Sequence, residues 1–518
     1  MTEPQSRRRF LADVGKGTLW ATIGPALASE LGMVPAVMAE GKAEGLNFGD
    51  LEPLVRLMQD TPVAKLQPAL VAQMNKGVPL QRLLAAGALA NARSFGGEDY
   101  IGFHTMMALQ PALKMAASMP EKEEALPVFK VLYRNTAQMQ ATGACEHEAL
   151  QPVAPLTEAQ EITADRLRDA VRHKDKAEAE RLFATLVGKD KEAAFDALIY
   201  CVQDNVEVHR TVLPYRAWDM LGIVGQQHAQ TLLRQSLRYC LKAESHRHAS
   251  WDEHGRVLAK ALDEHKLLGK EAGTRGADDA FVEKLSQTIF GGTPEQAAEA
   301  VAAALAEGFD PGEIGEAISL AANQLLLRDR GRRPEWESAG KPVGSVHGDS
   351  IGVHASDSIH AWRNLAQATQ GRNRFACLIL AAWQVARDRG PAGDFLAWEP
   401  VPSKYQLRNV KAKEAEGLLE ELDEAIRGNL QAQAGAVVQR YGELGLHADE
   451  MFKVFLKYGV SEDGALHAEK YFQTVWDEFH RTRPAFRWRH LIGLARVTAS
   501  EYGRPAPGQA EARDLLGV

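Results

Sequence analysis

Asp99-Tyr-Ile-Gly-Phe-His104 occurs, with small changes, four times in this 518-residue chain. Three copies follow the pattern Asp-x-Ile/Val-Gly/Glu-Phe/Val-His, and the fourth is one residue shorter. The other copies are Asp204-Asn-Val-Glu-Val-His209, Asp349-Ser-Ile-Gly-Val-His354 and Asp463-Gly-Ala-Leu-His467. A motif that returns every 105 to 145 residues indicates a large internal repeat.

Apolar segments flank every copy of the motif in the same order. One rich in Ala and Leu precedes the motif, a second begins at the histidine, and a third follows about 20 residues later. Their apolar residues recur at i, i+3 and i+4, as in amphipathic helices. The regular alternation of apolar and polar residues that marks a β-strand is nearly absent. The sequence therefore predicts an all-α fold, a helical-repeat array of about four three-helix units that is solenoid-like or closed on itself.

The predicted units divide the chain after an N-terminal leader. Residues 1–39 form the leader, and the units are 40–160, 161–272, 273–395 and 396–518, the last with a C-terminal tail. Repeated helical units can share one continuous core, so we expect one domain rather than four.

The leader contains Ser6-Arg-Arg-Arg-Phe-Leu11, followed by an apolar run from Val14 to Leu27. An arginine pair before a modestly apolar run is typical of a twin-arginine signal, and a basic N-terminal arm is the alternative. The pattern predicts a periplasmic or otherwise exported protein whose first partner is the twin-arginine export machinery. No other stretch has the ~18 apolar residues needed to span a bilayer, so we expect no membrane span in the mature chain.

Composition excludes several classes of function. Apolar residues make up 45% of the chain and charged residues 25%, as in an ordinary soluble protein. The net charge is −8, so the composition gives no sign of a basic surface that would bind nucleic acid. The four cysteines form no metal or redox motif; Cys201 and Cys240 could pair if the protein is exported. The motifs of nucleotide-fold dehydrogenases, P-loop proteins, HExxH metalloproteases and α/β-hydrolases are all missing.

The repeated histidines are the strongest candidates for chemistry. Imidazole is a common metal ligand, and side chains from several helices can converge on one site. The candidate ligands are His104, His209 and His354, with His467 or His360 as a fourth. Asp99, Asp204, Asp349 and Asp463 could orient the rings or cap the helices. Iron or zinc suits such ligands, and a haem held by two histidines is a variant. The alternative is that duplicated units repeat a capping Asp and a buried His for packing alone.

Three other clusters carry weaker predictions. His246-Arg-His248 with Asp252 and His254 resembles a metal cluster, with an exposed loop as the alternative. Cys145-Glu-His147 could bind a soft metal or be an ordinary loop. The arginines of the run 479–490 could clamp an anionic or aromatic ligand or join two helices. Those arginines are Arg483, Arg487 and Arg489.

Short phrases carry a resemblance to known proteins. Gly102-Phe-His104, Val208-His209 with Ala217-Trp218, and Gly352-Val-His354-Ala resemble an uncharacterised family of exported helical bacterial proteins, over most of residues 80–390. The resemblance implies that members of this family also have histidines at the positions of His104, His209 and His354. More distantly, the chain is similar to questin-oxidase-like proteins, an all-helical group whose named member performs a Baeyer–Villiger-type oxygenation. This second resemblance implies an oxidoreductase.

Two hypotheses follow. The first is an exported metal-dependent helical enzyme, an oxidoreductase that acts on a small organic substrate through a multi-histidine site. The second is a non-enzymatic helical-repeat scaffold that binds another exported protein or a cell-surface component. The first predicts that the motif histidines meet in a buried polar site, and the second predicts that they are dispersed along an extended concave surface.

Overall fold

The chain is helical throughout its described parts. The computed structural model describes residues 45–157, 162–248, 251–338, 341–346, 348, 350–390 and 394–518. In these ranges every extended regular element is a helix, and β contacts are limited to three isolated bridges. The all-α prediction is confirmed. The predicted leader, residues 1–39, lies outside the described ranges.

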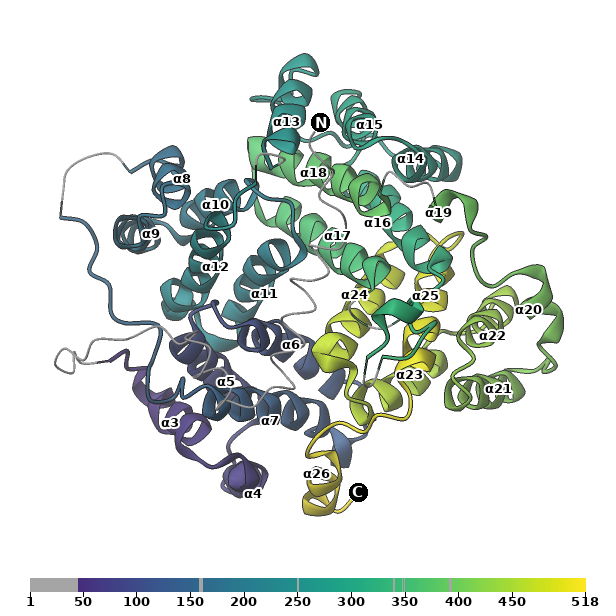
Figure 1. The fold of residues 1–518 in the computed structure, drawn as a ribbon, viewed down its shortest axis with the longest axis horizontal. Coiled ribbons are helices and arrows are strands. Elements are labelled where there is room, and N and C mark those ends of the chain that lie inside the picture. Colours follow the sequence, from purple (N-terminus) through teal and green to yellow (C-terminus); the bar gives the residue numbers. More distant parts are fainter. Residues whose placement is uncertain are drawn as a thin grey trace.

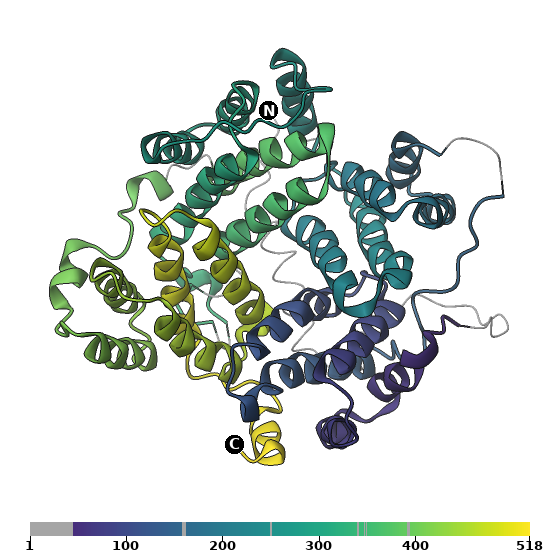
Figure 2. The same cartoon turned by 180° about the vertical axis from the view of Figure 1, so that it is seen from behind.

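Four helices surround the centre of the molecule, and each begins at one copy of the motif (Figure 1). α6 packs on α11, α11 on α17, α17 on α24, and α24 packs back on α6, so the four form a closed ring. We call this set the inner ring. The same arrangement is visible from the opposite side (Figure 2). The inner ring comprises α6 (Tyr100–Ala116), α11 (Val208–Val224), α17 (Ile351–Ala368) and α24 (His467–Arg481).

Each inner helix packs between the helix before it and the helix after it in sequence. The predicted apolar segments on either side of the motif are therefore helices, grouped in threes. The preceding helices are α5 (Leu80–Phe95), α10 (Lys191–Val202), α16 (Pro311–Arg328) and α23 (Asp449–Ser461). The following helices are α7 (Leu126–Ala141), α12 (Ala229–Glu244), α18 (Gly371–Arg389) and α25 (Trp488–Glu501).

Further helices cover the outside of these groups (Figure 1). The first group carries α3 (Glu52–Asp60) and α4 (Val63–Asn75), and the second carries α8 (Ala164–Arg172) and α9 (Lys176–Lys189). Around the third lie α13 (Trp251–Glu264), α14 (Asp279–Gly291), α15 (Pro294–Ala306) and the short α19 (Asp394–Ala397). The fourth carries α20 (Lys404–Asn409), α21 (Ala415–Arg427) and α22 (Gln431–Glu443), whereas the C-terminal α26 (Gln509–Leu516) packs on α4 and α7 of the first group.

Buried ionic contacts close the ring between its first and last groups. Lys130 on α7 forms an ion pair of 2.7 Å with Glu469 on α24, and both side chains are almost fully buried. The Lys130 ammonium also donates to the backbone carbonyls of Gly459 and Glu462. Removing one partner of a buried ion pair leaves an uncompensated charge, so the loss of either residue alone would strongly destabilise the closed ring.

α6 and α11 each continue as one helix past an internal proline, Pro111 and Pro214 respectively, so neither is split there. A Cys201–Cys240 disulfide is not formed, because both cysteines are buried free thiols.

Candidate functional site: four converging histidines

The four motif histidines meet inside the inner ring. Ring centroids are 4.8 Å apart for His104 and His209, and 5.8 Å for His209 and His354. The circuit closes with 5.4 Å between His354 and His467 and 5.0 Å between His467 and His104. We call this set the histidine cluster. The dispersed arrangement expected of an open scaffold is not observed.

Different local devices start the four inner helices. Asp99 caps α6 by accepting from the Gly102 backbone N–H, as its position before the helix predicts. Glu207 rather than Asp204 caps α11, and Ser350 caps α17. α24 has no side-chain cap; a short left-handed turn leads into it instead.

The left-handed turn belongs to the shortened motif. Gly464, Ala465 and Leu466 have φ values of 51°, 47° and 65°. Such values suit glycine but cost free energy at Ala and Leu. This turn leads from Asp463 into α24, where His467 starts the helix and joins the cluster although its motif lacks one residue.

Glycine two residues before the histidine lets the inner helix approach the preceding one. A Cβ at Gly102 would lie 2.5 Å from the Phe95 ring, and one at Gly352 would lie 2.5 Å from the Leu326 backbone. The second motif has Glu207 at the same position. Its side chain is therefore available for the imidazole.

Glu207 holds the His209 ring. Nδ1 of His209 lies 2.6 Å from Oε1 of Glu207, and the Tyr239 hydroxyl donates to the other carboxylate oxygen. Burial would raise the pKa of Glu207, but His209 and the hydrogen bonds from its ring and from the backbone outweigh burial and lower that pKa to about 2. A carboxylate only accepts hydrogen bonds, so Nδ1 of His209 carries a proton, and in the neutral imidazole the lone pair is then on Nε2.

Lys470 holds the His104 ring in the opposite sense. Its ammonium lies 3.0 Å from Nδ1 of His104, and both residues are buried. Burial lowers the pKa of Lys470 to about 8, with Asp357 and Glu469 acting against that shift. Burial and the Lys470 charge together hold the pKa of His104 well below its ordinary value. An ammonium has only donors, so Nδ1 of His104 accepts and Nε2 carries the proton.

His354 and His467 face each other through Nε2. The two Nε2 atoms are 3.3 Å apart, and Nδ1 of His467 donates to the Ala465 carbonyl at 3.1 Å. His467 therefore has its lone pair on Nε2. Two imidazole nitrogens on one tetrahedral zinc, each at about 2.0–2.1 Å, would lie roughly 3.3 Å from each other.

Two ring nitrogens of the cluster lack partners. Nε2 of His104 and Nε2 of His209 are buried and have no hydrogen-bond partner among the described residues. A buried polar atom without a partner points to a water or an ion in native proteins. As the rings stand, no group of three or more His, Cys, Asp or Glu side chains in the described ranges has ligand atoms placed to hold a metal ion.

A buried polar surface continues from the cluster. Lys470 lies one turn after His467, and Asp357 one turn after His354. Asp357 accepts from Thr474 at 2.8 Å, and burial raises its pKa. Arg216 is 1% exposed, donates to Gln110 at 3.2 Å and leaves Nε without a partner. These groups can orient a polar molecule and hold or supply protons beside the histidines.

The three predicted aspartates that the structure describes do not orient the rings. Asp99 accepts from Gly102 and Gln138, and Asp204 is held by Arg168 and Arg172. Asp463 pairs with Arg134 on α7. Asp349 lies outside the described ranges. The aspartate that opens the motif thus caps its helix or pairs with an arginine, whereas the group two residues before the histidine faces the ring in the second and fourth copies.

His360 is not part of the cluster. Its Nε2 lies 3.1 Å from Asp477 on α24, and its ring packs on Tyr215 at 5.4 Å. Six residues place it on a different face of α17 from His354, as the helical geometry predicts.

The arginine run joins helices, which was the structural alternative. Arg483 pairs with Glu316 and Asp279. Arg489 pairs with Glu283, and Arg487 stacks on Phe479. The ion pairs connect the region of α24 and α25 with α14 and α16, and they occupy the guanidinium groups of Arg483 and Arg489 that were expected to clamp a ligand.

Among the described residues of the histidine-rich stretch at 246–254, no metal-binding group occurs. His254 is buried and its Nε2 bonds the Gln203 carbonyl, while Asp252 pairs with Arg247. The exposed-loop alternative is therefore wrong for His254. At the other weak candidate, the Cys145 thiol lies near the Met139 carbonyl.

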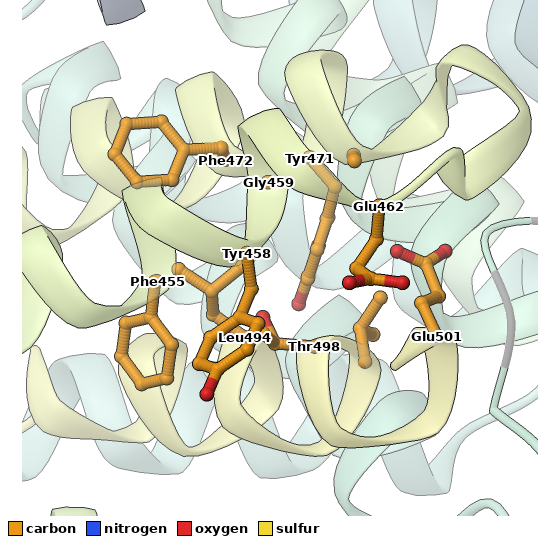
Figure 3. Close-up of a pocket in the computed structure, with 11 residues that line it drawn as sticks. Phe455, Tyr458, Gly459, Glu462, Tyr471, Phe472, Leu494, Thr498 and Glu501 are labelled. Carbon is orange, nitrogen blue, oxygen red and sulfur yellow. The ribbon is translucent and has the colours of Figure 1, made fainter. Parts of the chain in front are cut away.

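A small pocket occurs elsewhere, between α23, α24 and α25 (Figure 3). Tyr458 and Tyr471 line it together with the carboxylates of Glu462 and Glu501. None of the four motif histidines lines this pocket.

Comparison with known proteins gave no relative: no protein-family model, curated protein or solved structure matches this chain. Within the described ranges, none of the helices combines the length and apolar character that crossing a membrane requires.

Sequence reasoning missed Glu207, Lys470 and the Ala465 carbonyl. Glu207 could have been found, because it replaces the glycine of two other copies two residues before the histidine. The signal for Lys470 was weaker. It lies three residues after His467, so the two side chains share one face of the helix.

Proposed function

We propose that the protein is a metal-dependent oxidoreductase whose single metal ion is bound by the histidine cluster. The convergence of four imidazoles from four separate helices carries this proposal. Imidazole ligands suit iron, zinc and copper, and iron or copper can carry redox chemistry. The resemblance to questin-oxidase-like proteins favours oxidation of a small organic substrate. The proposal also includes export through the twin-arginine pathway.

His209, His354 and His467 are the proposed ligands. His209 and His467 present Nε2 lone pairs, because their Nδ1 atoms donate to Glu207 and Ala465. A carboxylate or carbonyl behind the ring is the usual partner of a metal-binding histidine. His354 and His467 already have the separation of two ligands on one ion. Binding would require the His209 ring to move closer to this pair.

His104 has a different proposed role. Because Lys470 donates to Nδ1, Nε2 of His104 is a hydrogen-bond donor at neutral pH. It can donate to a substrate oxygen or a water near the three ligands. The Lys470 ammonium adds a positive charge that favours an anionic group there. Three ligands with an open position would activate water or dioxygen when the metal is bound.

We do not extend the proposal to a haem. Two histidines could hold its iron, but the macrocycle would need the space that the other two rings occupy at centroid distances of 4.8 to 5.8 Å.

Elemental analysis with an absorption spectrum tests the proposal. The full chain is purified without a histidine tag and compared with a variant that carries His209→Gln, His354→Gln and His467→Gln. We expect about one iron per chain, lost in the variant, with unchanged helical circular dichroism. A protein that contains only zinc would contradict the assignment as an oxidoreductase but would still support a metal site at the histidine cluster. One copper per chain, lost in the same variant, would support the proposal as iron does, and a folded wild-type protein that binds none of iron, copper and zinc would overturn it.

A further inference from the structure

Arginine side chains from α8, α13 and the end of α12 line a pocket. The helices α8 and α13 lie at the periphery of the molecule (Figure 1). Arg168 and Arg172 come from α8, Arg247 follows α12, and Arg256 lies on α13. We call this the arginine pocket. It has none of the cluster histidines in its lining and does not depend on the proposed metal.

Positive charge exceeds negative charge in the lining. Four guanidinium groups face two carboxylates, those of Asp204 and Asp252, which leaves a net charge of plus two. His254 also lines the pocket; burial lowers its pKa to about 4, so it is neutral at pH 7. The wall therefore has two positive charges that its own carboxylates do not balance.

The buried carboxylate of Asp204 bonds two of the arginines but leaves part of each guanidinium group without an acceptor. Asp204, whose side chain is 2% exposed, accepts from Nε and Nη2 of both Arg168 and Arg172. Among the described residues no acceptor bonds Nη1 of either arginine. Asp204 thus fixes the orientation of both guanidinium planes and leaves a donor edge on each.

The other two arginines differ in how they are held. Arg247 pairs with Asp252 at 2.7 Å and with the buried Glu244 at 2.9 Å, and Glu244 itself also pairs with the buried Arg210 outside the lining, so the excess of two positive charges is unchanged. Arg256 is exposed and makes no hydrogen bond or ion pair with any described residue. Planar guanidinium groups bind phosphate and carboxylate oxygens in pairs, which makes such a set suited to an oxyanion.

We propose that the arginine pocket binds a small oxyanion with two negative charges, either free phosphate or the phosphate group of an ester. Two negative charges would neutralise the excess of the lining, and the fixed edges of Arg168 and Arg172 would contact it from one side. Arg247 and Arg256 would contact it from the other.

Isothermal titration calorimetry of the full chain with inorganic phosphate at constant ionic strength tests the inference. Arg256→Gln and Arg247→Gln remove charge from the pocket, and Arg256 makes no contact that folding needs. Lys260→Gln, which removes a positive charge from α13 outside the pocket lining, is the matched control. We expect each arginine variant to weaken binding at least about tenfold and the control to change it less than twofold.

Phenyl phosphate distinguishes the two sources of the oxyanion. Tighter binding than inorganic phosphate supports an esterified ligand, and equal or weaker binding supports free phosphate. The inference is overturned if neither binds beyond the response to chloride. It is also overturned if succinate binds more tightly than both, or if the arginine variants and the control behave alike.

Discussion

His209 and His104 are neighbours in the histidine cluster, yet their Nδ1 atoms have partners of opposite charge. Glu207 faces one ring and Lys470 faces the other. The carboxylate directs the His209 lone pair towards the cluster, whereas the ammonium directs the His104 proton there. Two copies of one motif can thus give a ligand and a hydrogen-bond donor, because the residues around the ring decide which nitrogen is protonated.

Substituting each histidine in turn should separate these roles most strongly. We expect His209→Gln to weaken zinc binding by more than about 100-fold, since it removes a ligand. His104→Gln should change the affinity by less than about fivefold, because it removes only a donor. Competition with a chromophoric chelator measures both. Equal losses in the two variants would show that His104 is also a ligand.

Removing the charge behind His209 should have the next largest effect. We expect Glu207→Gln to weaken zinc binding about 10- to 100-fold, the usual cost of losing the partner of a metal-binding histidine. Tyr239→Phe is the control, since it removes one hydrogen bond to Glu207 and keeps the carboxylate. If both variants bind like the wild type, Glu207 only caps α11.

Removing the charge behind His104 should act in the opposite direction. Lys470→Met keeps the side-chain length and removes a buried cation. The electrostatic repulsion between residue 470 and a metal ion bound in the histidine cluster is then lost. At an effective dielectric constant near 20 this repulsion amounts to several kcal/mol at short range, and we expect roughly tenfold or greater tightening. The same chelator competition measures it. Weaker binding by Lys470→Met would contradict the charge comparison.

The smallest expected effect concerns the left-handed turn that precedes His467. Ala465→Gly should stabilise the protein by about 0.5–1 kcal/mol, because φ at this residue is 47°. Ala303→Gly in α15, where the backbone is helical, should destabilise by a similar amount. Denaturant unfolding measures both. A loss of stability in Ala465→Gly would mean that the Ala465 methyl contributes more packing than strain.

The sequence predicted the helices and offered the meeting of the histidines as one of two hypotheses. A repeated motif at the start of each inner helix places equivalent side chains at equivalent positions, so a closed ring brings His104, His209, His354 and His467 together. The motif also includes two glycines, Gly102 and Gly352, that permit close helix packing. These features lie within short segments of the sequence, so they can be recognised without the structure.

The electrostatic partners could not be predicted in the same way. Lys470 meets His104 across 366 positions, and Lys130 meets Glu469 only when the ring closes. The repeated aspartates were misleading because a residue just before a helix can cap the backbone or pair with an arginine as readily as hold a ring. Whether the four helix groups derive from one repeated unit stays a prediction.

Cobalt(II) titration of the full chain, followed by visible absorption, tests the central claim most directly. A nitrogen-ligated cobalt ion with low coordination number absorbs strongly, whereas a hydrated six-coordinate ion is pale. We predict intense bands that saturate at one equivalent, persist in His104→Gln and disappear in His209→Gln. A pale spectrum in the wild type, or identical spectra in the three proteins, would contradict a metal centre built on His209, His354 and His467.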